Sequence, residues 1–230
     1  MTTVVNAVGN FSTDALSTTL VTTIPSVTAG NALIATGLFF GTGASTFSSN
    51  GTGTWTQIFD DGALRHRSWI CLNPSAGTTT VTATSAVAGF FTVHVMEVNG
   101  LQAAGSSTAV GAVNTTPTAT AWASSAINPA YLNFAVGVSS QVDNSTATST
   151  AGAGFSITTG TGMTSGTVRN TSEGDTLVVV YGDFAAGSVT ATGTWSTAVT
   201  GISWITSYQR ASGGGGGGGG QQNRLLLGVG

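Results

Sequence analysis

The chain has 230 residues, a formal net charge of −3 and 6% charged residues, against about 25% in an ordinary soluble domain. This length suits one all-β domain or two small ones. The chain has no lysine, and its few scattered arginines argue against a nucleic-acid partner, because binding to phosphates needs clustered cations. A surface of Thr, Ser, Asn and Gly suits a protein that packs against other copies, since excess charge would repel them.

The N-terminal stretch MTTVVNAVGNFSTDALSTTL has neither a basic region nor a continuous apolar run. No Sec signal peptide is therefore predicted, and we expect synthesis in a cytoplasm. No stretch reaches the roughly 20 apolar residues of a membrane span, so no membrane partner is expected. Cys71 is the single cysteine, which excludes an intramolecular disulfide and predicts a small buried side chain.

Alternation with a period of two, rich in Thr and Val, runs along the chain between clusters of Gly, Asn, Ser and Asp. This pattern is typical of β-strands, and no amphipathic helix is predicted. In chain order, the predicted strands are residues 17–24, 32–40, 54–59, 64–72, 78–84, 90–98, 131–139, 176–184, 188–195 and 202–209. Residues 101–126 are expected to connect two halves, with room for one further strand.

The two histidines of the chain lie in two segments that also carry acidic side chains. In FDDGALRHR, the residues Asp60, Asp61 and His66 are compatible with a metal site, but a hairpin turn is the favoured interpretation. In TVHVMEVNG, strand alternation places His94 and Glu97 on opposite faces, so they cannot share a site. The chain has no Gly-x-Ser-x-Gly and no phosphate-binding loop. We therefore expect no enzyme activity, no catalytic residue, no metal and no cofactor.

A faint internal repeat divides the chain. AGTTTVTATSAVAGFFTVHVMEV (76–98) resembles AGSVTATGTWSTAVTGISWITSY (186–208), and NALIATGLFF (31–40) parallels AYLNFAVGVS (130–139). Each half is predicted to supply about four strands in the same order, and two sheets packed face to face give one antiparallel β-sandwich over residues 1–211.

The aromatic residues of the predicted strands are expected to fill the core of this sandwich rather than to form a stacking platform for sugars. They are Trp55, Trp69, Trp195, Trp204, Phe39, Phe91, Phe134 and Tyr181. Among the aliphatic residues, burial is predicted for Val81, Val93 and Val95.

The segments VTAGNALIATGLFF, GTGTWTQI, RSWICLNPSAGTTTVTATSA and FFTVHVMEVNG, in this order, resemble a group of jelly-roll-like β-sandwich modules. These modules occur in tailed-phage virion proteins (minor tail, fibre and decoration proteins) and in bacterial surface proteins. Ala32 and Thr54 depart from the pattern. The resemblance covers about residues 25–210, implies a jelly-roll-like sandwich and carries no catalytic residue. Its matching positions are Gly30, Asn31, Leu33, Gly53, Trp55, Trp69, Ala76, Gly77, Val81, Thr82, Glu97, Asn99 and Gly100.

The chain ends with SGGGGGGGGQQNRLLLGVG, a poly-Gly tether (residues 212–220) followed by an apolar C-terminal arm (residues 221–230). Eight glycines do not fold alone, and as a coil they span about 16 Å. The arm is predicted to dock on neighbouring subunits, because each buried leucine could contribute about 1.5–3 kcal/mol. The residues assigned to this contact are Arg224, Leu225, Leu226, Leu227 and Val229.

These observations predict a non-enzymatic structural protein of a phage particle, namely a decoration, fibre or minor tail subunit located in the virion. Its expected partners are copies of itself and other virion proteins, with a host-surface glycan as a further candidate. The alternatives are a receptor- or carbohydrate-binding surface module, which a groove of exposed Trp and Asn or Asp would favour, and a bacterial filament subunit. The missing Sec signal counts against the filament.

Overall fold

A computed structural model of the chain describes residues 2–11, 16–39, 44–61, 66–102, 112–141, 146–164, 166–170 and 174–211, with only the main chain for 112–117. All regular secondary structure in these residues is β-strand, which confirms the predicted all-β class. In the described part of the chain, no helix could cross a membrane. The poly-Gly tether and the apolar arm lie outside the described residues.

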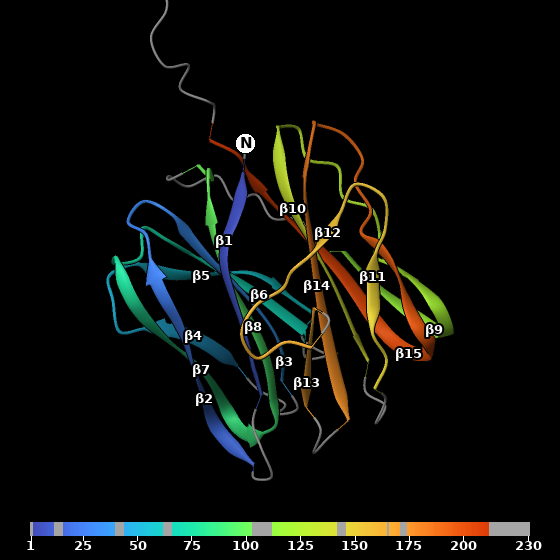
Figure 1. The fold of residues 1–230 in the computed structure, drawn as a ribbon, viewed down its shortest axis with the longest axis horizontal. Helices are drawn as coiled ribbons and strands as arrows, with labels where there is room; N and C mark the ends of the chain where they lie inside the picture. The colour runs from blue at the N-terminus through green and yellow to red at the C-terminus, as the bar shows by residue number, and fades with distance from the viewer. Residues whose placement is uncertain are drawn as a thin grey trace, which may run out of the picture.

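The strands follow one another along the chain in two sets (Figure 1). The first set is β1 (Thr3–Phe11), β2 (Ser17–Val27), β3 (Ala32–Phe39), β4 (Ser45–Ser49), β5 (Thr54–Asp60), β6 (His66–Leu72), β7 (Gly77–Gly89) and β8 (Phe91–Asn99). The second set is β9 (Ala112–Ala123), β10 (Asn133–Gln141), β11 (Ser149–Ala151), β12 (Ser156–Ile157), β13 (Thr167–Asn170), β14 (Asp175–Phe184) and β15 (Thr192–Gln209).

The strands form three antiparallel sheets, and the two halves share one strand order. The first half has a five-stranded sheet, β1-β8-β3-β6-β5, and a three-stranded sheet, β2-β7-β4. The second half has the order β11-β15-β10-β14-β12, with β9 also paired to β15 and β13 paired to β14. The order β9-β15-β10-β14 thus matches β1-β8-β3-β6. This match agrees with the internal repeat, in which segment 31–40 resembles segment 130–139, because β3 lies in the first segment and most of β10 lies in the second.

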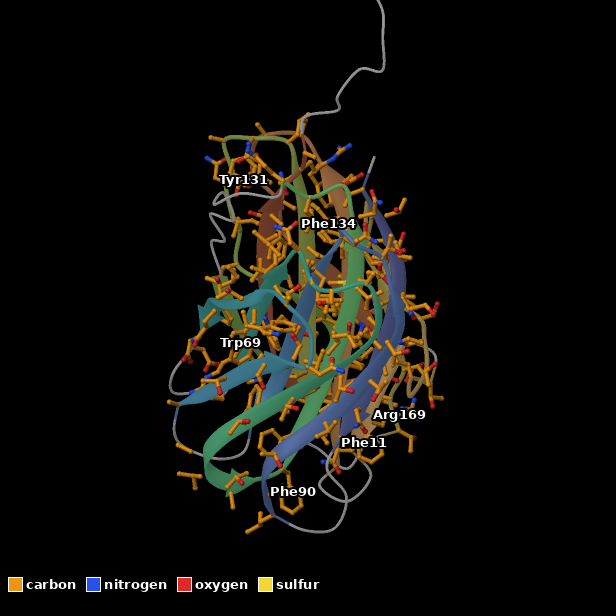
Figure 2. The ribbon with its side chains drawn as sticks, turned by 90° about the vertical axis from the view of Figure 1, so that its left-hand side faces the viewer. Phe11, Trp69, Phe90, Tyr131, Phe134 and Arg169 are labelled. Carbon is orange, nitrogen blue, oxygen red and sulfur yellow. The ribbon has the colours of Figure 1, made fainter. Side chains whose placement is uncertain are left out.

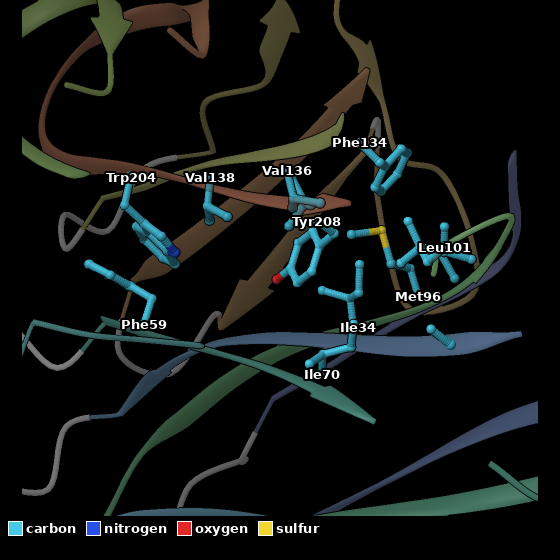
Figure 3. Packing of buried hydrophobic residues seen from close by; sticks show 14 of the residues in the cluster. Ile34, Phe59, Ile70, Met96, Leu101, Phe134, Val136, Val138, Trp204 and Tyr208 are labelled. Atoms are coloured by element: carbon cyan, nitrogen blue, oxygen red, sulfur yellow. The ribbon is translucent and has the colours of Figure 1, made fainter. Parts of the chain in front are cut away.

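The sheets form the predicted antiparallel sandwich, and their buried side chains gather in three clusters, so the sandwich has more than two layers. The central cluster lies between the five-stranded and the seven-stranded sheet (Figure 3). A second cluster lies between the five-stranded sheet and β2-β7-β4, and a third covers the other face of the seven-stranded sheet. Both large sheets are therefore covered on both faces, which explains why every residue of β3 and β10 is buried.

The predicted core residues lie in these clusters. Trp69, Val81, Val93 and Val95 are buried as expected. Four of the five tryptophans are at most 2% exposed, and Trp55 is partly buried. In the central cluster, the rings of Phe59 and Trp204 stack with their centroids 6.1 Å apart. Truncating a buried Phe or Trp to Ala typically costs about 3–5 kcal/mol, so these rings are a major part of the packing between the halves.

Several strands differ from the sequence-based expectation. The predicted strands 188–195 and 202–209 are not separate: residues 192–195 of the first and all of the second belong to one long strand, β15, which pairs with both β9 and β10. Strand β9 lies within the connecting segment 101–126, where the sequence left room for one further strand. Strand β1 is additional, because Asn6, Gly9 and Asn10 interrupt its alternation. The structure explains two of these positions: Asn6 Nδ2 donates to Pro25 O and Asn10 Nδ2 donates to Val21 O, each at 2.7 Å, along the edge of β2.

The first and last described strands meet at one end of the molecule (Figure 1). The Thr2 main-chain N–H donates to Asp183 Oδ2 at 3.1 Å, and Arg210 Nε lies 3.6 Å from Oδ1 of the same carboxylate. The Ala211 N–H donates to Gly100 O at 2.8 Å. In Figure 2, Tyr131 lies at this end and Phe11 and Phe90 lie at the opposite end. The described chain therefore ends beside the start of β1.

Candidate functional site

Asp61, His66 and Ser140 form a hydrogen-bonded chain between the two halves. His66 Nδ1 lies 2.7 Å from Asp61 Oδ2, and His66 Nε2 lies 2.7 Å from Ser140 Oγ. The hairpin of β5 and β6 positions the first pair, because the Asp61 N–H donates to His66 O and the His66 N–H donates to Asp61 Oδ1. Residues 62–65 of the predicted turn lie outside the described residues, but the strands that they connect form the expected hairpin.

This chain has the residue types of a serine hydrolase triad, and its environment decides what it can do. A catalytic serine needs an approach for the substrate and usually sits on a sharp turn. Ser140 is 1% exposed and lies in β10, where it is paired with Leu177 on one side and Ile202 on the other. The edge of the His66 ring also packs on Trp204, with centroids 4.8 Å apart. The three residues therefore act as a polar bridge between the halves.

His94 and Glu97 face different layers, as strand alternation predicts. Met96 of the same strand belongs to the central cluster, and Val95 belongs to the cluster under β2-β7-β4. His94 faces the central cluster and is fully buried, and neither ring nitrogen has a hydrogen-bond partner. Burial lowers the pKa of His94 to about 3, because desolvation disfavours the charged imidazolium. His94 is therefore neutral near pH 7.

Glu97 holds the turn between β2 and β3. Its Oε1 accepts hydrogen bonds from Asn31 Nδ2 at 2.5 Å and from the Thr28 N–H at 2.8 Å. Gly30 completes the same turn with φ of +85°, a conformation that costs glycine little. Gly30, Asn31 and Glu97 are three positions of the sequence resemblance, so this part of the motif has a structural explanation and needs no ligand.

A small pocket, here called the seam pocket, opens where the edge of β1 approaches the second half. It has a volume of about 240 Å³, and its exposed surface is mostly polar. Cavities for drug-sized ligands are usually about 300–1,000 Å³, so the seam pocket is small for a cofactor. Its lining residues are Val4, Val5, Asn6, Ala7, Ile157, Thr158, Thr159 and Tyr181.

The charged side chains are held by other groups of the chain. Asp60 pairs with Arg67 at 3.0 Å, and Arg67 also donates to Ser45 Oγ. Asp183 pairs with Arg210, and Arg169 donates to main-chain carbonyls. Asp61 and Glu97 have the partners given above, and Asp175 is not free either. Thus all eight Asp, Glu and Arg side chains that the structure describes have partners within the chain.

The assembly residues predicted from the sequence belong to the apolar C-terminal arm. Arg224, Leu225, Leu226, Leu227 and Val229 all lie outside the described residues. The sequence allowed a metal site at Asp60, Asp61 and His66. In the part of the chain that the structure describes, no group of three or more side chains could hold a metal ion. The polar role of Ser140 and the seam pocket were not predicted, because each depends on residues that are distant in the sequence.

Comparison of the chain with protein-family models, with curated proteins and with solved structures gives no match.

Proposed function

We propose that the protein is a non-enzymatic structural subunit of a phage particle, a decoration, fibre or minor tail subunit that assembles through its C-terminal arm. The observation that carries the proposal is how the charged side chains are paired. Each described Asp, Glu and Arg side chain has a partner within its own chain. The strands β2, β4 and β7 contain no charged residue at all. Such a surface packs against identical copies without electrostatic repulsion.

The buried polar residues support a structural role over catalysis. The Asp61–His66–Ser140 chain lies inside the molecule, with Ser140 in a strand paired on both sides. The resemblance to virion modules provides the assignment to a phage particle, and it rests on the motif positions in residues 25–210. The burial of four tryptophans counts against a tryptophan platform for sugars, which requires exposed rings.

The test compares the full chain with a variant in which Leu225, Leu226 and Leu227 are replaced by serine. We expect the full chain to form regular oligomers in sedimentation and electron microscopy, and the variant to remain monomeric, because the apolar contact area of the arm is lost. A variant with Gln221 and Gln222 replaced by serine is the control and should assemble normally. Near-ultraviolet circular dichroism of all three proteins should be the same. A monomeric full chain, or equal assembly of all three proteins, would refute the proposal.

A further inference from the structure

The outer edge of β1 is covered along only part of its length. Its inner edge pairs with β8 from Thr3 to Phe11, with one interruption at Val5. On the outer edge, the pairing found among the described residues is a parallel bridge between Val8 and Thr161, with the Gly9 N–H donating to Thr161 O at 2.8 Å. Closer to the start of β1, the same edge lines the seam pocket. Exposed strand edges present main-chain donors and acceptors that invite another strand.

Two glycines allow another segment to cover part of this edge. A Cβ atom at Gly160 would lie 2.0 Å from Ala7 O, and one at Gly162 would lie 2.0 Å from Gly9 O. Contacts this short are sterically forbidden, so the segment around Thr161 reaches β1 only because its neighbours have no side chains. A strand that extended this cover toward the start of β1 would also have to approach closely at the seam pocket. It would therefore also need residues without side chains.

The uncovered part has the features of a receiving edge. Val5 is the extra residue of a β-bulge between Val4 and Asn6, and a bulge leaves main-chain groups unpaired. The Val5 side chain is 52% exposed. The surface inside the pocket is mostly polar, which suits the main chain of a peptide better than a leucine side chain.

The described chain ends close to this edge. Arg210 contacts Asp183, and Tyr181 of the pocket lies two residues away along β14, about 7 Å at the usual rise of a strand. On the other side, Ala211 bonds to Gly100, which follows the Asn99–Thr3 pair. The eight glycines at 213–220 begin two residues after Ala211. Extended, they would cover about 26 Å, which exceeds the length of the uncovered part of β1.

We propose that residues 213–220 occupy the seam pocket of their own chain and extend along the outer edge of β1, parallel to it. Three properties of the tract fit this site: its lack of side chains, its main-chain hydrogen-bonding groups and its starting point beside the pocket. The short connection favours the chain's own tract over that of a neighbour, because short linkers give effective concentrations in the millimolar range. This docking would set the direction in which the apolar arm leaves the molecule, and it does not depend on the proposed assembly.

Disulfide cross-linking of the full chain tests the proposal. The test protein carries Val5→Cys and Gly216→Cys. The matched control carries Val21→Cys and Gly216→Cys, because Val21 is 51% exposed but lies on β2, away from the pocket. The native Cys71 should not compete, because it is buried and burial raises the pKa of its thiol to about 11.

Under mild oxidation at low protein concentration, we expect the Val5 pair to cross-link within one chain at least about tenfold faster than the Val21 pair. Non-reducing electrophoresis separates this product from cross-linked dimers. Equal rates for the two pairs would overturn the proposal. Cross-links formed only between chains would also overturn it and would assign the pocket to the tract of a neighbouring copy.

Hydrogen exchange provides a second readout without added cysteines. In the full chain, those main-chain amides of residues 4–7 that lie on the outer edge and do not bond to β8 should be protected. Replacing Gly214, Gly216, Gly218 and Gly220 by valine should increase their exchange at least about tenfold, because Cβ atoms prevent the close approach. Replacing Gln221 and Gln222 by valine adds bulk after the tract and should leave the exchange unchanged. Equal exchange in the wild type and the glycine variant would overturn the proposal.

Discussion

His66 Nε2 lies 2.7 Å from Ser140 Oγ, and this contact joins residues that are 74 positions apart in the sequence. Because His66 belongs to β6 and Ser140 to β10, the contact connects the two central sheets. Asp61 holds the other ring nitrogen, so the imidazole is fixed at both ends. A fully satisfied buried network of this kind specifies one packing of the sheets, because a displaced sheet would leave its groups unpaired.

The Ser140→Ala variant tests the bridge. It leaves a ring nitrogen of His66 buried without a partner, so we expect the free energy of unfolding to fall by about 1–3 kcal/mol. Urea denaturation at pH 7 measures the change. The exposed Ser48→Ala variant is the control and should stay within about 0.5 kcal/mol of the wild type. Equal stability of the two variants would contradict the bridging role.

The Glu97→Met variant tests the turn between β2 and β3. It removes the acceptor of Asn31 Nδ2 and of the Thr28 N–H. We expect a loss of about 1–3 kcal/mol of stability per buried donor left unpaired, measured by thermal and urea unfolding. The Glu97→Gln variant keeps an oxygen acceptor in the same place and should recover much of this loss. If both variants unfold alike, the hydrogen bonds do not stabilise the turn.

The pH dependence of stability tests the buried, neutral state of His94. Burial lowers the pKa of His94 from 6.5 to about 3, so between these values the unfolded chain binds a proton that the folded chain excludes. Stability should therefore fall as the pH decreases from 6.5 toward 3, with a contribution of up to about 1.4 kcal/mol per pH unit.

The His94→Leu variant should lack this component. Urea unfolding at pH 4.5, 5.5 and 7.5 should give a larger stability advantage of the variant over the wild type at the lower pH values. A constant difference between the two proteins across this range would show that His94 does not titrate as its burial requires.

The Val95→Thr variant tests the core under β2-β7-β4. Val95 is fully buried, so threonine places a hydroxyl of nearly equal size in an apolar site without a designed partner. We expect a loss of about 1–3 kcal/mol, measured by urea denaturation. Val21→Thr is the matched control, because Val21 is 51% exposed and the substitution there should change stability by less than about 0.5 kcal/mol. Equal midpoints would contradict the predicted core position.

Much of the fold follows from local pattern. The alternation of Thr and Val predicts most of the long strands, because successive side chains of a strand point to opposite faces. The same rule separates His94 from Glu97, and the repeated segments predict the shared strand order of the halves. The Asp-Asp-Gly turn indicates the β5–β6 hairpin. These features depend on residues that are close in the sequence, so the sequence by itself determines them.

Other features depend on contacts between distant residues, and only the tertiary structure decides them. Strand β1 breaks the alternation because Asn6 and Asn10 bond to the main chain of β2 and Gly9 packs on Val168. Ser140 has no local signal of a polar role, since its partner is 74 residues away. Gly160 and Gly162 resemble loop glycines, yet they allow close contact with the edge of β1. The stacking of both large sheets between further layers also follows from packing alone, because a strand covered on both faces needs apolar neighbours that its own sequence does not specify.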